Sequence, residues 1–295
     1  MTADAERSIL SRLDRRRPGV RIALVAVRAL VFAALAVLCV GPLFWLFKAA
    51  TSTTTETLSD PFTLWPSGIH WSTFAEVWTK IDFARYFVNT LWLMTGSLFF
   101  GLLVATTGGY GLAVLKPRYA KVVFAALLAT LFIPGVISLV SLYLTVMDMP
   151  LVHVNLIGTL WAVWLPASAN AVNVLLMQRF FAAIPADLFE AARIDGAGPF
   201  RVFVSLVLPM SRPILGVVSL LTLVGAYKEF LWPLLVLPNP QDQPISVALP
   251  RLETAVDFAQ FMGALFISVI IPMVLFLVFQ RQFLRAAGNS GALKG

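Results

Sequence analysis

The residues of this chain best placed to do chemistry lie in a charged stretch at residues 178–212. Pro185 can begin a helix there, and Gly196 can end it before Pro199 begins a second short helix. Spacings of three and four residues put one set of side chains on a single side of the first helix: Leu188, Ala191, Ala192 and Asp195. The small alanines form a low surface that a groove on a partner protein could approach closely. A helix that rests on the protein's own bundle is the competing interpretation, and the residues favour neither.

A second set of polar side chains lies within long apolar segments. These residues are Ser138, Ser141, Tyr143, Ser168, Asn170, Asn173 and Tyr227. They could hydrogen-bond a hydroxylated ligand, or they could bond neighbouring helices, which is worth about 0.6 to 2 kcal/mol in a membrane. Glu229 and Lys228 add charges to the same region. An ionisable residue inside a membrane segment is a functional candidate by default, although these two lie near a segment end where they can reach water.

Other kinds of site are excluded by what the chain lacks. No G-x-x-x-x-G-K-[S/T] loop is present, so the chain cannot cradle nucleotide phosphates in that way. Cys39 is the only cysteine, which rules out a disulfide within the chain and a cysteine-based metal site. His70 and His153 lack metal-ligand spacing. We therefore expect no catalytic residue, no metal and no cofactor bound by this chain.

The elements that must position these residues are apolar runs long enough to cross a membrane. Of 295 residues, 59% are hydrophobic and 13% are charged. A span needs about 20 mostly apolar residues, and in lipid it must be helical so that its backbone groups are paired. Six runs qualify: residues 29–47, 87–115, 122–147, 156–177, 213–237 and 261–279. The sequence therefore predicts an all-α integral membrane protein with six transmembrane helices.

Some details of these spans can also be predicted. Pro134 and Pro166 are expected to kink their helices, and the glycines of residues 108–111 are expected to let helices pack closely. No internal repeat and no broken helix is evident. Between the first two spans, the Thr-rich residues 51–57 are expected to form a loop, and the tryptophans that follow fit an interfacial aromatic belt.

The positions of the basic residues orient the chain. With six spans, both termini lie on one side, and that side holds 17 of the 22 Lys and Arg residues. The positive-inside rule therefore places the termini and residues 178–212 in the cytoplasm. It also makes nucleic-acid binding an unlikely use of the net charge of +7. The expected organisation is a basic N-terminus at 1–28, a membrane domain at 29–280 and a cytoplasmic tail at 281–295.

One motif carries a specific resemblance. Glu190-Ala191-Ala192, then Gly196, then the stretch 206–209 (Leu-Val-Leu-Pro), resembles the Glu-Ala-Ala loop of permease subunits of bacterial ABC importers. The spacing matches throughout, with Leu206 in place of the usual Ile. The flanking residues are similar to the carbohydrate branch of this binding-protein-dependent inner-membrane family, in particular to its MalG-like subunits. The similarity runs from about residue 87 to the C-terminal Gly-Ala-Leu-Lys-Gly.

This resemblance implies a type I permease fold in which residues 178–212 hold a coupling helix that docks on a separate ATPase. It implies that Glu190 makes the charged contact, that Ala191 and Ala192 provide the close fit, and that Asp195 and Gly196 fix the turn. Six residues would line the sugar pathway: Ser141, Tyr143, Asn170, Asn173, Tyr227 and Glu229. The implied partners are a second, homologous permease, two subunits that bind ATP and Mg, a periplasmic or lipid-anchored binding protein, and membrane lipid.

The implied activity is uptake of a di- or oligosaccharide across the bacterial inner membrane, without an ATPase site in this chain. One departure concerns the fifth span, where the family commonly has Trp-Asn-Glu/Asp-Phe and this chain has Tyr227-Lys228-Glu229-Phe230. Two alternatives stay open: an ABC permease for another solute, such as a glycerophosphodiester, or a secondary transporter. A secondary transporter would usually show repeats, broken helices and buried ionisable residues.

Overall fold

The structure is a computed structural model that describes residues 18–292, with side chains described as far as residue 280. Most of the expected basic N-terminus and the last residues of the expected tail lie outside the described residues. Within them the chain forms helices and no strands, as the need to pair every backbone group in lipid predicts.

Three helices are each long and apolar enough to cross a membrane alone. They are α1 (Pro18–Thr51), α4 (Phe83–Tyr110), which continues into the π-helical turn η3 (Gly111–Leu115), and α15 (Phe258–Ala292). They contain the predicted spans 29–47, 87–115 and 261–279. Each long helix extends beyond its apolar run, because polar flanking residues continue the same backbone hydrogen bonding outside the segment.

The third predicted span is not one continuous helix. The structure has α5 (Ala120–Thr130), then the 3-10 turn η4 (Gly135–Ser138) and α6 (Leu139–Met147), with a bend of 104° at the break. Pro134 precedes the second part; it has no N–H to donate and its ring clashes with a preceding helical turn. The kink predicted at Pro134 is therefore a full break, and the expectation that no helix is broken is wrong.

The fourth predicted span is also interrupted. It consists of α7 (Trp161–Ser168) and α8 (Ala171–Ala182), and only Ala169 and Asn170 separate them. By length and hydropathy alone, α8 can also form a bent pair with α9 (Ala186–Ile194), at 75°. We assign α7 and α8 to one span, because both pack along α4 and because α9 carries Asp187, Glu190 and Arg193.

The fifth predicted span ends earlier than residue 237. Before it lie α10 (Pro199–Val202), the π-helical turn η5 (Phe203–Val207) and α11 (Leu208–Met210), which meet α12 (Arg212–Lys228) at 80°. The helix α12 stops at Glu229, whose backbone is extended. Two short helices follow, α13 (Leu231–Val236) and η6 (Pro240–Asp242). By length and hydropathy alone, with α8 paired to α9, counting each bent pair as one span gives up to six spans among the described residues.

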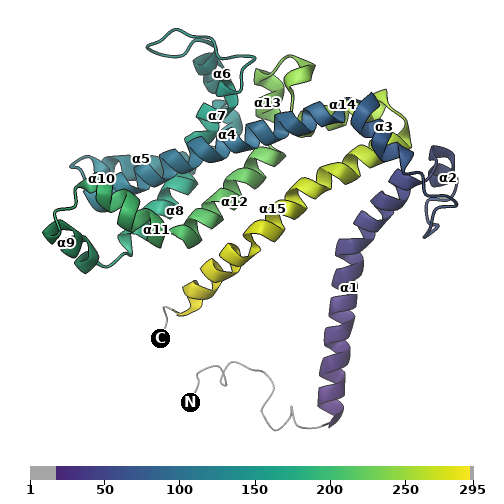
Figure 1. The fold of residues 1–295 in the computed structure, drawn as a ribbon, viewed down its shortest axis with the longest axis horizontal. Helices are drawn as coiled ribbons and strands as arrows, with labels where there is room; N and C mark the ends of the chain where they lie inside the picture. Colours follow the sequence, from purple (N-terminus) through teal and green to yellow (C-terminus); the bar gives the residue numbers. More distant parts are fainter. Residues whose placement is uncertain (1–17, 293–295) are drawn as a thin grey trace.

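The helix α4 is the centre of the bundle (Figure 1). It packs against α7, α8 and α12, while α12 packs against α15. Glycine makes two of these approaches possible: a Cβ on Gly109 would lie 2.8 Å from the Met177 Cβ, and one on Gly96 would lie 2.1 Å from the Trp164 ring. The close packing predicted for the glycine cluster is confirmed at Gly109.

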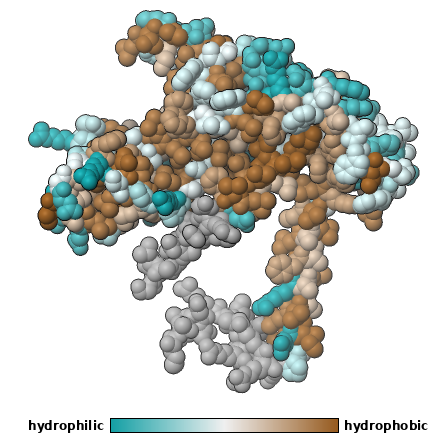
Figure 2. All heavy atoms as spheres, viewed as in Figure 1, coloured by the Kyte–Doolittle hydropathy of each residue, from teal (hydrophilic) through white to brown (hydrophobic). Residues whose placement is uncertain are grey.

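The helix α1 stands apart from this bundle along most of its length (Figures 1 and 2). Leu30, Phe32 and Leu38 are each 71% exposed, and its side chains become buried only at the end, from Lys48 to Thr51. A helix that is apolar all round is typical of contact with lipid or with other membrane helices.

The two long connections lie at opposite ends of the bundle. Figure 1 places α9 and α10 at one end of α4, whereas α2 (Thr54–Ser59), α3 (Ser72–Lys80) and α14 (Ile245–Ala255) lie at the other. The expected loop at residues 51–57 is wrong in part, because α2 forms there. The Thr53 side chain caps it by accepting a hydrogen bond from the Glu56 N–H at 3.2 Å.

Candidate translocation cavity and coupling loop

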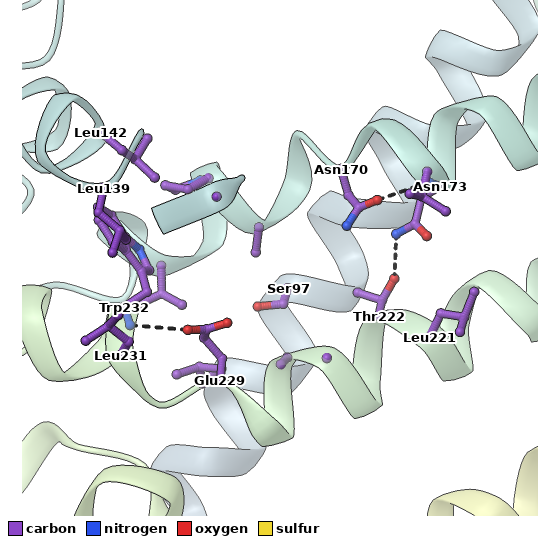
Figure 3. A pocket seen from close by; sticks show the side chains of 18 of the residues that line it. Ser97, Leu139, Leu142, Asn170, Asn173, Leu221, Thr222, Glu229, Leu231 and Trp232 are labelled. Atoms are coloured by element: carbon purple, nitrogen blue, oxygen red, sulfur yellow. Dashed lines mark hydrogen bonds between the residues drawn. The ribbon is translucent and has the colours of Figure 1, made fainter. Parts of the chain in front are cut away.

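A cavity of about 670 Å³ lies beside α4, where the breaks of the third, fourth and fifth spans come together. Its walls are largely apolar, formed by residues such as Leu139, Leu142 and Leu221 (Figure 3). Its polar lining residues are Ser97, Asn170, Asn173, Thr222 and Glu229. The volume is within the range of about 300–1,000 Å³ that is common for small-molecule sites, and a few convergent polar groups in an apolar wall is their usual chemistry.

Asn170 and Asn173 reach the cavity because of the break in the fourth span. Asn170 is the N-cap of α8, and its Oδ1 accepts a hydrogen bond from the Asn173 N–H at 3.1 Å. The buried Asn173 side chain then donates from Nδ2 to Thr222 Oγ1 on α12, at 3.0 Å (Figure 3). Both asparagines line the cavity, and Asn173 also makes the alternative bond between helices.

Glu229 enters the cavity because α12 ends there. Its Oε1 accepts a hydrogen bond from the Trp232 N–H at 3.2 Å, and its backbone carbonyl accepts one from Ser246 Oγ at 2.7 Å. The carboxylate therefore caps α13 while it lines the cavity. Lys228 is exposed and does not line this cavity. Among the described lining residues there is one carboxylate and no Lys, Arg or His.

Ser97 is a cavity residue that the sequence reasoning missed. It lies on α4, its side chain is buried, and its Oγ has no hydrogen-bond partner within the described chain. Figure 3 shows it on the cavity wall between the Glu229 side and the asparagine side. No distinct signal in the sequence singled it out, because the same predicted span also holds Thr90, Thr95, Thr106 and Thr107.

Three predicted pathway residues lie elsewhere. Tyr227 turns away from the cavity and donates from its hydroxyl to the Ser268 carbonyl on α15, at 2.7 Å. Tyr143 packs on the cluster around Trp232, and Ser141 is exposed without lining the cavity. The last two lie on α6, which follows the break at Pro134 and is bent by 104° from α5. For Tyr227, the bond between helices replaces the ligand contact.

Residues 178–212, which the resemblance identifies as a candidate coupling loop, have the predicted helix–turn–helix form. Pro185 is the N-cap of α9, so the helix begins at Ala186, one residue after the predicted start. The Ala197 N–H donates to the Ala192 carbonyl at 2.9 Å, and Gly196 between them has φ +72°. This is the usual glycine-terminated helix end, in which only glycine adopts the left-handed backbone without strain. The turn predicted at Asp195 and Gly196 is therefore present.

The outer face of α9 differs from the predicted face by one side chain. Glu190 and Ala191 are exposed, as are Leu188 and Asp195. Ala192 is half-buried and packs, with Phe189, on the protein's own core around Met177. Within the described chain, Glu190 forms no ion pair. The helix thus rests on its own bundle by one face, as one interpretation expected, and leaves the Glu190–Ala191 face exposed.

Comparisons with known proteins agree with this arrangement. A family model described as "Binding-protein-dependent transport system inner membrane component" matches residues 97–286. The chain is 26% identical to a diacetylchitobiose uptake system permease protein of Streptomyces coelicolor, over 83% of this chain and 82% of the relative. It is 30% identical to an sn-glycerol-3-phosphate transport system permease protein of Pectobacterium atrosepticum, over 84% of this chain and 90% of the relative.

The fold also resembles a solved structure. A chain of a bacterial ABC transporter involved in the import of the acidic polysaccharide alginate superposes with a TM-score of 0.79, at 20% identity, over 93% of this chain and 99% of that chain. This likeness shows that the chain has the fold of that ABC transporter chain.

Proposed function

Since the chain belongs to the family of binding-protein-dependent transport system inner membrane components, we propose that it forms half of the pore of an ATP-driven importer for a neutral di- or oligosaccharide. The family match spans residues 97–286, which hold both the cavity and the coupling loop. The chain is a membrane transport component. Its solute, its partners and its orientation are the content of the proposal.

The polar groups that line the cavity support a sugar as the solute. Amide and hydroxyl groups both donate and accept hydrogen bonds, as do the hydroxyls of a sugar. Asn170 and the unpartnered Ser97 Oγ are placed to exchange such bonds, and Glu229 can accept them. The diacetylchitobiose permease among the relatives supports the same solute class.

The charge of the cavity distinguishes sugars from the anionic alternative. A glycerophosphodiester, or the glycerol-3-phosphate named for one relative, would bring a negative charge toward Glu229. Two like charges 4 Å apart repel by about 4 kcal/mol at an effective dielectric constant near 20. With no cation among the described lining residues to offset that repulsion, a neutral solute fits this half of the pathway better than an anion.

The open face of α9 supports an ATPase that acts from outside the chain. In the proposal, two separate subunits bind ATP and Mg, each permease offers one coupling helix, and closure of the ATPases moves it. Glu190 makes the charged contact and Ala191 allows a close approach, while Ala192 ties the helix to the permease itself. A second, homologous permease completes the pore, and a periplasmic or lipid-anchored binding protein delivers the sugar.

The orientation follows from the basic residues. We place both termini and α9 in the cytoplasm and α2, α3 and α14 on the outer face of the bacterial inner membrane. The two loop regions lie at opposite ends of α4 (Figure 1), which is what a membrane between them requires. Nucleic acid has no part in the proposal, since the charge is explained by the inner membrane face.

The test is to purify a tagged chain from its native membrane and to reconstitute it in vesicles. We expect an ATPase and a second permease to co-purify, and we expect sugar uptake to require ATP inside and a sugar-loaded binding protein outside. A chain that is recovered alone and moves solute down an ion gradient without ATP would be a secondary transporter and would contradict the proposal. Uptake of a glycerophosphodiester in preference to sugars would contradict its solute class only.

A further inference from the structure

Two π-helical turns meet where the coupling loop touches the bundle. One is η3, at the end of α4, and the other is η5, directly after α10 in the coupling loop. Residues of both turns, Ala113 and Val207, are buried in the same apolar cluster. A π turn inserts an extra residue into a helix at some cost, and such turns are frequent at functional sites.

Tyr110 is the side chain that joins the two turns. It lies at the last position of α4 and is 6% exposed. Its ring packs against Phe203, the first residue of η5, with 4.9 Å between ring centroids. Its hydroxyl donates to the carbonyl of Pro199, the first residue of α10, at 2.9 Å. Within the described chain, this is the side-chain hydrogen bond that ties the coupling loop to the second span.

Tyr110 also shares a rigid helix with the cavity. Ser97 lies on α4 as well, and the separation along the helix axis is about 20 Å at 1.5 Å per residue. Next to Tyr110, Gly109 holds α4 against Met177 and Gln178 of α8, so this end of α4 cannot slide freely past its neighbour. A displacement of α10 thus has a direct mechanical route through Tyr110 into the helix that carries Ser97.

We propose that Tyr110 is a positioning residue that transmits movement of the coupling loop to α4 and so to the cavity. The inference rests on the proposed function, because it needs an ATPase that moves α9. The ring contact with Phe203 resists separation of α4 and the loop, and the hydrogen bond to Pro199 fixes the direction in which α10 can turn. Loss of the hydroxyl lets the loop move without α4, so that ATP is hydrolysed with less transport.

The deciding variant is Tyr110→Phe, which removes the hydroxyl and keeps the ring against Phe203. In reconstituted complexes of the wild type and of the variant, we measure the sugar imported per ATP hydrolysed, together with ATPase activity and thermal stability. In Tyr110→Phe we expect this ratio to fall at least fivefold, while the ATPase subunits stay bound and ATP hydrolysis continues. Phe203→Leu, which keeps apolar volume but loses the ring contact, is expected to lower the same ratio and decides the matter if Tyr110→Phe is not recovered.

Two control variants separate coupling from stability. Tyr227→Phe removes a hydroxyl-to-carbonyl bond of the same kind, but between α12 and α15. Tyr119→Phe alters an exposed tyrosine near the same membrane face. The proposal is supported if the sugar imported per ATP hydrolysed falls more in Tyr110→Phe than in Tyr227→Phe when both variants lose the same amount of stability. We expect the ratio for Tyr119→Phe to match that of the wild type.

Two results would contradict the proposed role of Tyr110, and only the second would also contradict the proposed function. If wild-type complexes couple uptake to ATP and both the Tyr110→Phe and Phe203→Leu variants keep the wild-type ratio, the transmission role of Tyr110 is wrong and the proposed function stands. If the wild-type chain transports without any ATPase, the proposed function and this inference fail together.

Discussion

The hydrogen-bonded series Asn170–Asn173–Thr222 shows how single residues can both hold the fold and line the cavity. The Asn170 side chain satisfies a backbone N–H that the break in the fourth span leaves free, and Asn173 bonds Thr222 across to α12. A buried amide without a partner is costly in an apolar setting. These hydrogen bonds therefore stabilise the cavity wall, whereas Ser97 Oγ makes no hydrogen bond within the described chain.

That contrast predicts opposite outcomes for two small substitutions. Ser97→Ala removes an unsatisfied hydroxyl, so we expect unchanged thermal stability but a several-fold loss of sugar uptake, because a solute hydroxyl loses its partner. Thr222→Val leaves the Asn173 amide unpaired, so we expect a loss of about 1 kcal/mol in stability. Thermal unfolding of the purified complex and uptake by vesicles measure both effects. Wild-type uptake by Ser97→Ala would remove Ser97 from the pathway.

At the end of the bundle that carries α2 and α3, Glu56 joins two parts of the long loop. The Ser67 N–H donates to Glu56 Oε1 at 2.6 Å and the Ser67 hydroxyl donates to Oε2 at 3.1 Å. The backbone hydrogen bond from Ser67 lowers the pKa of Glu56 below its usual value. Because the folded pKa is depressed, this stabilisation is complete above the unfolded pKa and is lost as the pH falls through the folded pKa.

We therefore expect residues 56–67 to loosen only in acid, below about pH 4. Hydrogen–deuterium exchange of this segment, corrected for the intrinsic pH dependence, should rise on acidification in the wild type. In Glu56→Gln the exchange should be raised already at neutral pH and respond little to acid. A Glu56→Gln loop protected as well as the wild type would show that the carboxylate is not what holds it.

At the scale of elements, close contact between α4 and α8 depends on a missing side chain. A methyl group at Gly109 would meet the Gln178 backbone nitrogen at 2.9 Å, whereas one at Gly111 would meet nothing within 4 Å. We expect Gly109→Ala to destabilise the protein by about 1–3 kcal/mol, as overpacking does, and Gly111→Ala to change little. Unfolding in detergent compares the two, and equal stabilities would contradict the close approach.

The coupling helix gives a second prediction at this scale. Glu190→Lys reverses the charge on the open face of α9, so we expect uptake to be lost while the protein stays inserted, and Glu190→Gln to lose only part of it. Gly196→Leu should act in the same direction, because a side chain at φ +72° costs about 1–2 kcal/mol of strain. Normal uptake with normal assembly in Glu190→Lys would exclude this docking role.

At the scale of the whole molecule, the testable property is its orientation in the membrane. Cys39 is the only cysteine, so a Cys39→Ser protein offers a clean background for single cysteines. We expect a membrane-impermeant maleimide to label Thr63→Cys in spheroplasts and to label Ala183→Cys only after the inner membrane is permeabilised. Both residues are exposed and lie in the two opposite loop regions. The reverse labelling would invert the proposed orientation.

Much of this protein is determined by local features of its sequence. Apolar runs of about 20 residues require a membrane, since no core of a protein this size could bury them. The helix pair of the coupling loop follows from Pro185, Gly196 and Pro199, because proline and glycine restrict or free the backbone at their own positions. Such features act over a few residues, and periodicity and spacing therefore reveal them.

The cavity was decided only by tertiary structure. Ser97, Asn173, Thr222 and Glu229 come from α4, α8 and the end of α12, and breaks near Pro134, Asn170 and Glu229 bring these elements together. The sequence predicted Tyr143 and Tyr227 in the pathway, whereas their side chains contact neighbouring segments in the structure. Which side of a helix faces a neighbour depends on bends and on contacts with distant segments. The same reason hid Tyr110, whose partner Pro199 lies 89 residues away.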